Sequence, residues 1–524
     1  MKKKTPPKGP RHLDKHLFEA GQQCQKRLWL DYHEPVPGEP SALRQAMSAA
    51  GEQLRQLART AFPKGVTVAA ADAVAAAAET KQRIAEGIPV LFGATFVADG
   101  VEARCDILVV HKDGAFDLFE IKSGTKANPR YVVDLALQAH VVEASGHKLR
   151  AAWLLTMNPK YVHKEGADYP AMQLLRSADV TAKVQRHMDQ VRRRLQTFRH
   201  AVGDDAVLQL PMGTFCTTPF PCPHLARCSK EAPPLPLREL PELTRQLETE
   251  LHKEGIEDLA ALSPSRDGLT FRQRRTLQCL HDKTPVLEPF VRTELRQCSK
   301  PLHFLAIAAT TEALPRFDGQ RPWRRMPYAF AVRTVHADGR LENVSFAHVE
   351  RTDPRPPFVA ALAKHLEVGG TIVCWDDETL DELRALLDDL PNGKAQVRAI
   401  IGHPHLDLMQ LFDAGLFHPG VRSHADLRAS TKALLGDDSG ERLAVWGEVA
   451  LVEALAKATA PRVRSTTRDK IAAEIVAGLD WAAERLLKLY ETYAEVEAPA
   501  PKPKVVAPRP AVVKPLPKPL PKEL

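Results

Sequence analysis

The sequence lacks any apolar run that approaches the roughly 20 residues needed to span a bilayer, which excludes a transmembrane segment and a membrane partner. The N-terminal stretch MKKKTPPKGPRH has no apolar segment behind its charges, so we expect no secretory signal and a cytoplasmic protein. Internal repeats are also absent. Cysteine is scarce, with eight residues, and in a reducing compartment clustered cysteines indicate metal binding rather than disulfides.

The chain has 524 residues, too many for one hydrophobic core, so we expect two or three domains. Its net charge of +7 suits a polyanionic partner better than an acidic one. The predicted parts are a basic disordered tail (1–12), a first α/β domain (13–230), a linker and helical connector (231–300), a second α/β domain (301–495) and a Pro/Lys-rich disordered tail (496–524).

Hydrophobic periodicity predicts a mixed α/β fold with a central sheet for residues 13–230. The expected elements, in chain order, are helices at 17–30, 42–62 and 69–86, strands at 90–97, 102–110 and 115–122, a helix at 131–145, a strand at 151–157 and a basic helix at 180–200. A helical segment at 244–298 leads to a second α/β region, for which the expected elements are strands at 302–308, 328–333 and 371–375 and helices at 380–390 and 470–493.

The segment ARCDILVVHKDGAFDLFEIKSG carries the first chemical signal. Asp106 begins one strand, and the turn signal Asp113-Gly114 pairs it with the strand that carries Glu120 and Lys122. A period of two puts Glu120 and Lys122 on one face. The hairpin is therefore predicted to bring two carboxylates and one ammonium to a single point.

That combination suits phosphodiester hydrolysis. Asp106 and Glu120 would hold one or two Mg²⁺ or Mn²⁺ ions, which polarise the phosphate and acidify a bound water. Lys122 would orient this water and stabilise developing charge. Asp134 and Gln138 share a face of the next helix, so Gln138 can point at the strand ends. The alternative is a set of ordinary polar positions, because a D…ExK pattern is common by chance.

A second signal is the series Cys216-x5-Cys222-x5-Cys228, which makes four thiolates with the distant Cys24. The spacing of one plus three favours an iron–sulfur cluster, whereas zinc usually takes two C-x2-4-C pairs. Buried free cysteines are the third alternative. His224 within the loop is either a group behind the metal ligands or an ordinary surface histidine, and we expect the second.

In combination, these motifs resemble the RecB-like nucleases with iron–sulfur clusters, such as the CRISPR-associated RecB-like exonucleases and the AddB nuclease. A closer match is an uncharacterised bacterial family that joins such a domain to a DnaQ-like exonuclease domain. The matching stretches include QQCQKRLWL, LARTAFPKGV, DLFEIKSGTKANPRYVVDLALQAHVVEASG and LLTMNPKYV. The resemblance implies a PD-(D/E)XK (restriction-endonuclease-like) fold, a [4Fe-4S] cluster on Cys24, Cys216, Cys222 and Cys228, and a catalytic set of Asp106, Glu120, Lys122 and the supporting Gln138.

The sequence departs from this pattern in two places. Related nucleases carry a His or Glu on an early helix, where this chain has Gln56, a poor metal ligand; Glu52, one turn earlier, is the candidate substitute. In the second region, which resembles a degenerate RNase H-like or DnaQ-like exonuclease, the expected Asp-x-Glu is replaced by Ala306-Ile307-Ala308. Two-metal chemistry is therefore not expected there. The candidate remnants of its later acidic motifs are Asp376 or Asp377, Asp407 and Asp480.

We therefore predict a metal-dependent DNA nuclease, in particular an exonuclease on single-stranded or frayed ends in DNA repair, recombination or defence. Its partners would be DNA and, as candidates, a helicase or other repair or defence proteins. The alternative is a catalytically inactive nucleic-acid-binding scaffold with a structural iron–sulfur or zinc site. A third hypothesis is a zinc-clasped interaction protein with no nucleic-acid role.

Overall fold

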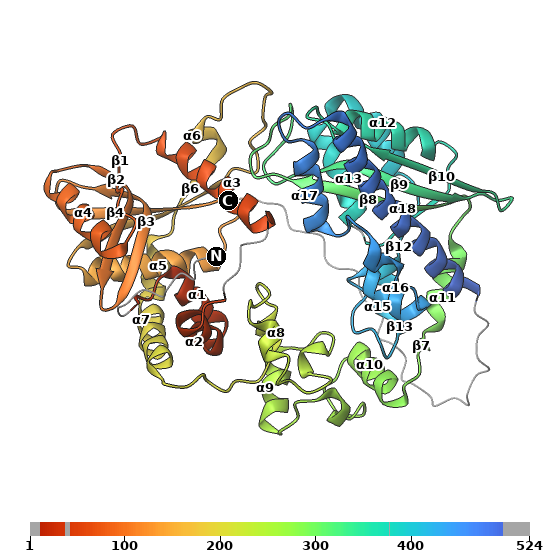
Figure 1. Cartoon of the computed structure of the whole chain (residues 1–524), viewed down its shortest axis with the longest axis horizontal. Helices are drawn as coiled ribbons and strands as arrows, with labels where there is room; N and C mark the ends of the chain where they lie inside the picture. The colour runs from red at the N-terminus through yellow and green to blue at the C-terminus, as the bar shows by residue number, and fades with distance from the viewer. Residues whose placement is uncertain (1–10, 37–41, 377, 496–524) are drawn as a thin grey trace, which may run out of the picture.

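The computed structural model describes residues 11–36, 42–376 and 378–495. Most of the predicted N-terminal tail, the whole C-terminal tail and Asp377 lie outside the described residues. Figure 1 shows two α/β regions that face each other, with a helical connector below them. The mixed α/β class predicted from the sequence is confirmed.

The first region contains a six-stranded mixed sheet whose strands follow chain order. Its strands are β1 (Val66–Thr67), β2 (Val90–Ala98), β3 (Val101–Val110), β4 (Ala115–Lys122), β5 (Lys148–Met157) and β6 (Leu175–Asp179). β2, β3 and β4 are antiparallel, whereas β4 and β5 are parallel. The four predicted strands are confirmed to within a few residues. β6 was missed because LRSAD is a polar, half-exposed sequence.

Helices cover both faces of this sheet. They are α1 (Lys15–Gln23), α2 (Gln25–His33), α3 (Ala42–Arg59), α4 (Ala73–Ala85), α5 (Pro129–Ala144), α6 (Ala171–Leu174) and α7 (Thr181–Gly203). α1, α5 and α7 contribute to one apolar cluster, and α3 contributes to a separate one. The single helix predicted at 17–30 is wrong, because Cys24 has an extended backbone (φ −162°, ψ 127°) that separates α1 from α2.

The connector is helical, as predicted, but it is divided by turns. After the short helix α8 (Leu225–Cys228) at the end of the first region, its helices are α9 (Arg245–Lys253), α10 (Phe271–Asp282) and α11 (Pro289–Gln297). A capping box of Thr270 and Gln273 begins α10. Leucines of the connector form a small cluster of their own. A two-stranded sheet of β7 (Val286–Leu287) and β13 (Leu416–Phe417) joins the connector to the second region.

The second region contains a five-stranded sheet in the order β10-β9-β8-β11-β12. Its strands are β8 (Leu302–Thr311), β9 (Arg325–Val335), β10 (Leu341–Ala347), β11 (Thr371–Cys374) and β12 (His405–Asp407). The helices are α12 (Arg355–Leu366), α13 (Glu378–Asp389), α14 (Lys394–Ile401), α15 (Leu408–Gly415), α16 (Leu427–Leu435), α17 (Glu448–Ala458) and α18 (Ser465–Glu495). α12, α13 and α14 share one apolar cluster with the sheet, whereas α17 and α18 share another.

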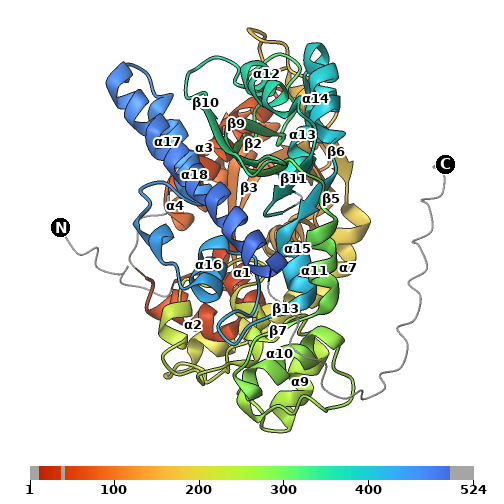
Figure 2. The same ribbon diagram turned by 90° about the vertical axis from the view of Figure 1, so that its right-hand side faces the viewer.

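The two regions are in direct contact through the loop between β8 and β9, residues 312–324. Ala313 is buried in the apolar cluster that contains Leu54 of α3. The Trp323 indole N–H donates to the Ser123 carbonyl just after β4, and the Tyr169 hydroxyl donates to the carbonyl of residue 315 at 2.8 Å. α17 also contacts α3, and both views place these two helices side by side (Figures 1 and 2). The two sheets therefore lie in one folded unit.

Among the described residues, no helix has both the length and the apolar character that a membrane crossing requires.

The second sheet contains a buried histidine that predicts a pH-dependent stability. His303 of β8 is fully buried, and its ring nitrogens bind the Gly369 carbonyl (2.7 Å) and the Thr334 hydroxyl (2.9 Å). Burial lowers the pKa of His303 from 6.5 to about 4. The unfolded chain therefore takes up this proton at a higher pH than the folded chain.

We expect the free energy of unfolding to fall as the pH drops from 6.5 towards 4, because protonation then favours the unfolded state. Urea unfolding of His303→Gln, which cannot titrate, should show a shallower decline over this window. His405→Gln, at an exposed position of β12, is the control. If the free energy of unfolding declines equally steeply with pH in the native protein, His303→Gln and His405→Gln, the decline does not come from His303.

Candidate active site and cysteine clasp

The β3–β4 hairpin forms the floor of the candidate active site. Its turn requires a positive φ, and Gly114 supplies it (φ 78°). The register pairs Ile107 with Phe119, which brings Asp106 opposite Glu120. The Asp106 carboxylate accepts a hydrogen bond from the Ile121 N–H at 2.8 Å. Asp106 lies in the interior of β3 rather than at its start, so that detail of the sequence analysis is wrong.

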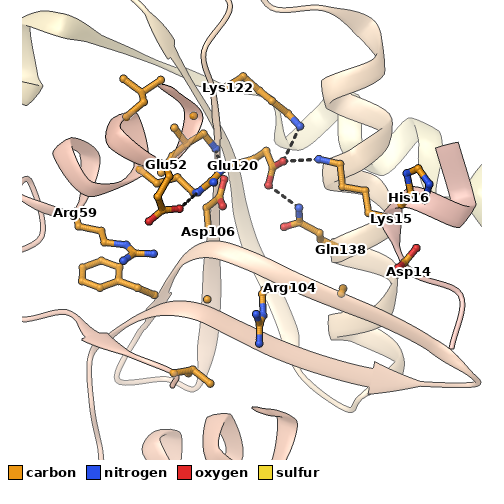
Figure 3. A pocket seen from close by; sticks show the side chains of 18 of the residues that line it. Asp14, Lys15, His16, Glu52, Arg59, Arg104, Asp106, Glu120, Lys122 and Gln138 are labelled. Atoms are coloured by element: carbon orange, nitrogen blue, oxygen red, sulfur yellow. Dashed lines mark hydrogen bonds and ion pairs between the residues drawn. The ribbon is translucent and has the colours of Figure 1, made fainter. Parts of the chain in front are cut away.

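Four charged side chains meet next to Asp106, and we call them the charge quartet: Lys15, Glu120, Lys122 and Asp134. Glu120 Oε1 lies 2.8 Å from the Nζ atoms of both lysines. Asp134 Oδ2 lies 3.0 Å from Lys15 Nζ and 2.9 Å from Lys122 Nζ. Each lysine thus bridges the same two buried carboxylates, and Figure 3 shows both ammonium groups at Glu120.

Gln138 completes the surroundings of Glu120. Its Nε2 donates to Glu120 Oε2 at 2.7 Å, so α5 presents Gln138 to the strands as the sequence predicts. Its Oε1 is buried and has no hydrogen-bond partner among the described residues. Lys15, on the distant helix α1, was missed by sequence reasoning, because no local pattern links it to the hairpin. Asp134 was recognised only as a neighbour of Gln138.

The charges in the site shift one another's pKa values in opposite directions. Burial and the nearby Glu120 charge raise the pKa of Asp106 to about 7. Burial would also raise the pKa of Glu120, but the ammonium groups of Lys15 and Lys122 outweigh it and lower that pKa to about 2. Burial opposes the charge on Lys15, yet Glu120 and Asp134 hold its pKa above the usual range. Glu120 is therefore the permanent anion, and Asp106 is the carboxyl that changes charge near neutrality.

A cavity of about 620 Å³ opens over these residues. Asp106, Glu120 and Lys122 line it, and further cationic side chains line it as well: Lys15, Arg55, Arg59 and Arg104. Glu52 of α3 also lines the cavity, whereas Gln56 is exposed and its Nε2 donates to Glu52 Oε1 at 3.4 Å. The structure thus brings Glu52, the candidate substitute for the missing metal ligand, to the cavity. There its Oε2 lies 2.9 Å from Arg55 Nε.

The donor chemistry of the site fits a hard divalent cation. Asp106 and Glu120 offer carboxylate oxygens, and the unpartnered Oε1 of Gln138 is a third hard oxygen, all of the type that Mg²⁺ and Mn²⁺ prefer. Among the described residues, however, no group of three His, Cys, Asp or Glu side chains has the geometry of a preformed metal site. Lys15, Lys122 and Gln138 occupy the oxygens of Glu120 instead.

The four predicted cluster ligands line one small cavity, and we call this arrangement the cysteine clasp. Cys24 lies between α1 and α2, Cys216 ends a short 3₁₀ helix, Cys222 lies in the following loop and Cys228 ends α8. The Cys222 N–H donates to the Cys216 carbonyl at 2.9 Å. Burial raises the pKa of the Cys24, Cys216 and Cys222 thiols. The four cysteines thus share one cavity, but among the described residues no group of three or more His, Cys, Asp or Glu side chains, these cysteines included, is arranged to hold a metal ion.

Polar contacts fasten the clasp to the N-terminal helices. The Gln23 amide donates to the carbonyls of Phe215 (2.7 Å) and Phe220 (2.8 Å). His224 lies 2.7 Å from an Asp31 carboxylate oxygen and is only 4% exposed. The surface position predicted for His224 is therefore wrong, since the loop turns this ring inward onto α2. A buried carboxylate partner is not visible in a local sequence pattern.

The second region gathers some of its predicted acidic residues. Ala306 and Ala308 lie on β8, as expected from the sequence. Asp376 and Asp407 line a common cavity of about 890 Å³ with Asp413, whereas Asp480 of α18 does not line it. Asp407 accepts a hydrogen bond from the Gln410 N–H at 2.7 Å and so caps α15.

The fold and the site together define a chain of two mixed α/β regions with a charged cavity in the first. Residues 303–425 match a family described as a domain of unknown function, DUF2779. This match covers the second sheet and its helices α12 to α15. No curated protein matches the chain. The charge quartet and the cysteine clasp both lie outside the matched residues.

The clasp can be tested by its metal content. Cys222→Ser should weaken binding of iron or zinc by at least about 10-fold, because even residues behind metal ligands have effects of this size. It should also lower the midpoint of thermal unfolding, since metal binding stabilises the fold. Metal analysis and the visible absorption of anaerobically purified protein would distinguish an iron–sulfur cluster from zinc. Cys298→Ser, outside the clasp, is the control. Equal metal content in the two variants would exclude the clasp as a metal-binding site.

Proposed function

We propose that the chain is a metal-dependent DNA nuclease of the PD-(D/E)XK, RecB-like type. The observation that supports this most is the position of Asp106 opposite Glu120 and Lys122 on paired strands, with Gln138 bound to Glu120. Carboxylates, an ammonium and an amide meet at the floor of a cavity whose walls carry both arginines and carboxylates. The wall arginines are the groups that suit an anionic substrate. The proposed substrate is DNA with single-stranded or frayed ends.

Asp106 and Glu120 would hold Mg²⁺ or Mn²⁺. A bound ion of this kind supplies a Lewis acid and an acidified water. Lys122 Nζ lies 5.0 Å from the centre of the Tyr131 ring, and this contact with the two carboxylates holds the ammonium at the strand end. There it can stabilise the negative charge that develops on the phosphate.

Phosphates on either side of the cleaved bond are assigned to Arg55, Arg59 and Arg104, because these side chains line the cavity. The basic helix α7 is a weaker candidate, since none of its residues lines the cavity. Bound partners do not distinguish the two sets, because Arg55 pairs with Glu52 and arginines of α7 have partners too. Arg194 donates to Gln22 at 2.7 Å, and Arg192 pairs with Asp189 at 3.0 Å.

The proposal includes a [4Fe-4S] cluster, or alternatively zinc, on the clasp. The second candidate function is a catalytically inactive nucleic-acid-binding scaffold. Two observations favour it: Gln56 is exposed where related nucleases carry a metal ligand, and Ala306 and Ala308 stand on β8 in place of carboxylates. Under either function, we assign the second region a supporting role rather than a catalytic one.

Cleavage of end-labelled single- and double-stranded DNA tests the proposal. With Mn²⁺ or Mg²⁺, Lys122→Ala and Asp106→Ala should each lower the rate at least about 100-fold, because the first removes charge stabilisation and the second removes a metal ligand. Lys126→Ala, an exposed position just beyond the same strand, should cleave like the native protein. If the native protein binds DNA but cleaves no better than Lys122→Ala, the scaffold function is correct.

A further inference from the structure

Lys15 is the cavity residue whose contacts the proposed reaction leaves unexplained. It is the first residue of α1, and the N–H of Leu17 binds the capping Asp14 next to it at 2.8 Å. Its Nζ shares Glu120 Oε1 with Lys122 and shares Asp134 Oδ2 as well. One oxygen of Glu120 therefore carries two ammonium groups, whereas a single lysine would be enough to neutralise this carboxylate.

A divalent cation at Glu120 would lie beside two ammonium groups that already share one oxygen of this carboxylate. Like charges a few ångströms apart repel one another at the effective dielectric of a partly buried site. Metal binding at Glu120 is therefore favoured when one lysine moves away. Lys15 is the better candidate for this movement, because its side chain is 38% exposed, whereas that of Lys122 is 16% exposed. Lys122 also packs against the Tyr131 ring.

The backbone of α1 is fixed at both ends, so this movement is confined to the Lys15 side chain. Before the helix, the Leu13 N–H donates to the Gly100 carbonyl at 2.9 Å, and the Glu102 N–H donates to the Leu13 carbonyl at 3.0 Å. At its other end, Gln23 and Cys24 belong to the cysteine clasp and its contacts. The helix thus holds Lys15 at the rim of the cavity in either position of its side chain.

We propose that Lys15 is a resident cation that competes with the divalent metal for Glu120. It keeps the buried carboxylates paired when metal is absent, and it leaves Glu120 when metal binds. Lys15 then remains on the cavity wall, where a phosphate of the substrate is its next anionic partner. This inference rests on the proposed function, because it takes Glu120 as a metal ligand.

The test is the affinity of the full-length protein for Mn²⁺, measured by isothermal titration calorimetry without DNA. Lys15→Met removes the competing charge, so it should bind Mn²⁺ about 10-fold more tightly than the native protein, which corresponds to about 1.4 kcal/mol. Lys15→Arg, which keeps the charge, should stay near the native affinity. Lys126→Met is the control for loss of a nearby exposed lysine.

A merely structural role for Lys15 predicts the opposite sign, because a loosened site would bind Mn²⁺ more weakly. If a folded Lys15→Met protein binds Mn²⁺ no more tightly than the native protein, the inference is wrong. The proposed function stays intact in that case, provided that the native protein binds Mn²⁺. Absence of Mn²⁺ binding and of cleavage in the native protein would overturn both. Where circular dichroism shows that Lys15→Met is unfolded, Lys15→Gln, which is neutral but can still donate to Glu120, replaces it with the same expected tightening.

Discussion

The burial of Glu120 and Asp134 between two lysines is the interaction on which the candidate site depends. Removing one partner from a buried pair typically costs ~3–5 kcal/mol, because the remaining charge is left uncompensated. The lysines come from α1 and β4, and the carboxylates come from β4 and α5. The packing of these three elements and the electrostatics of the site therefore depend on each other. A shift of α1 or α5 would leave charges unpaired at the floor of the cavity.

Because the site depends on the position of α1, the contacts between the cysteine clasp and the other end of this helix also matter to the site. The Gln23 side chain joins α1 to the carbonyl of Phe215, 192 positions further along the chain. Closing a loop of that length costs conformational entropy that the contacts within it must offset. A metal-bound clasp would supply this stabilisation at the end of α1 opposite Lys15. The contacts of the clasp and those of the charge quartet thus lie at opposite ends of one short helix.

The sequence predicted the parts of the site that depend on local pattern. A two-residue turn signal and strict alternation were enough to place Asp106 opposite Glu120 and to set Lys122 beside it. The spacing of one helical turn was enough to aim Gln138 at them. Lys15, the burial of His224 and the break at Cys24 were not predictable in this way. Lys15 depends on Glu120 and His224 depends on Asp31, each more than 100 residues away in the chain. Cys24 lines a cavity with the equally distant Cys216, Cys222 and Cys228, and such long-range contacts leave no periodic signal.

Although β8 carries alanines where the resemblance predicts carboxylates, the second region still packs against the first through the loop between β8 and β9. β8 and β9 hold the two ends of residues 312–324, and this loop places Ala313 in the apolar cluster beneath α3. It also places Trp323 on the Ser123 carbonyl, one residue after Lys122. The strand end that presents Lys122 is therefore supported from the second sheet. These contacts come from the loop and not from the side chains of β8, so the path of the loop brings the second region against the neighbouring site.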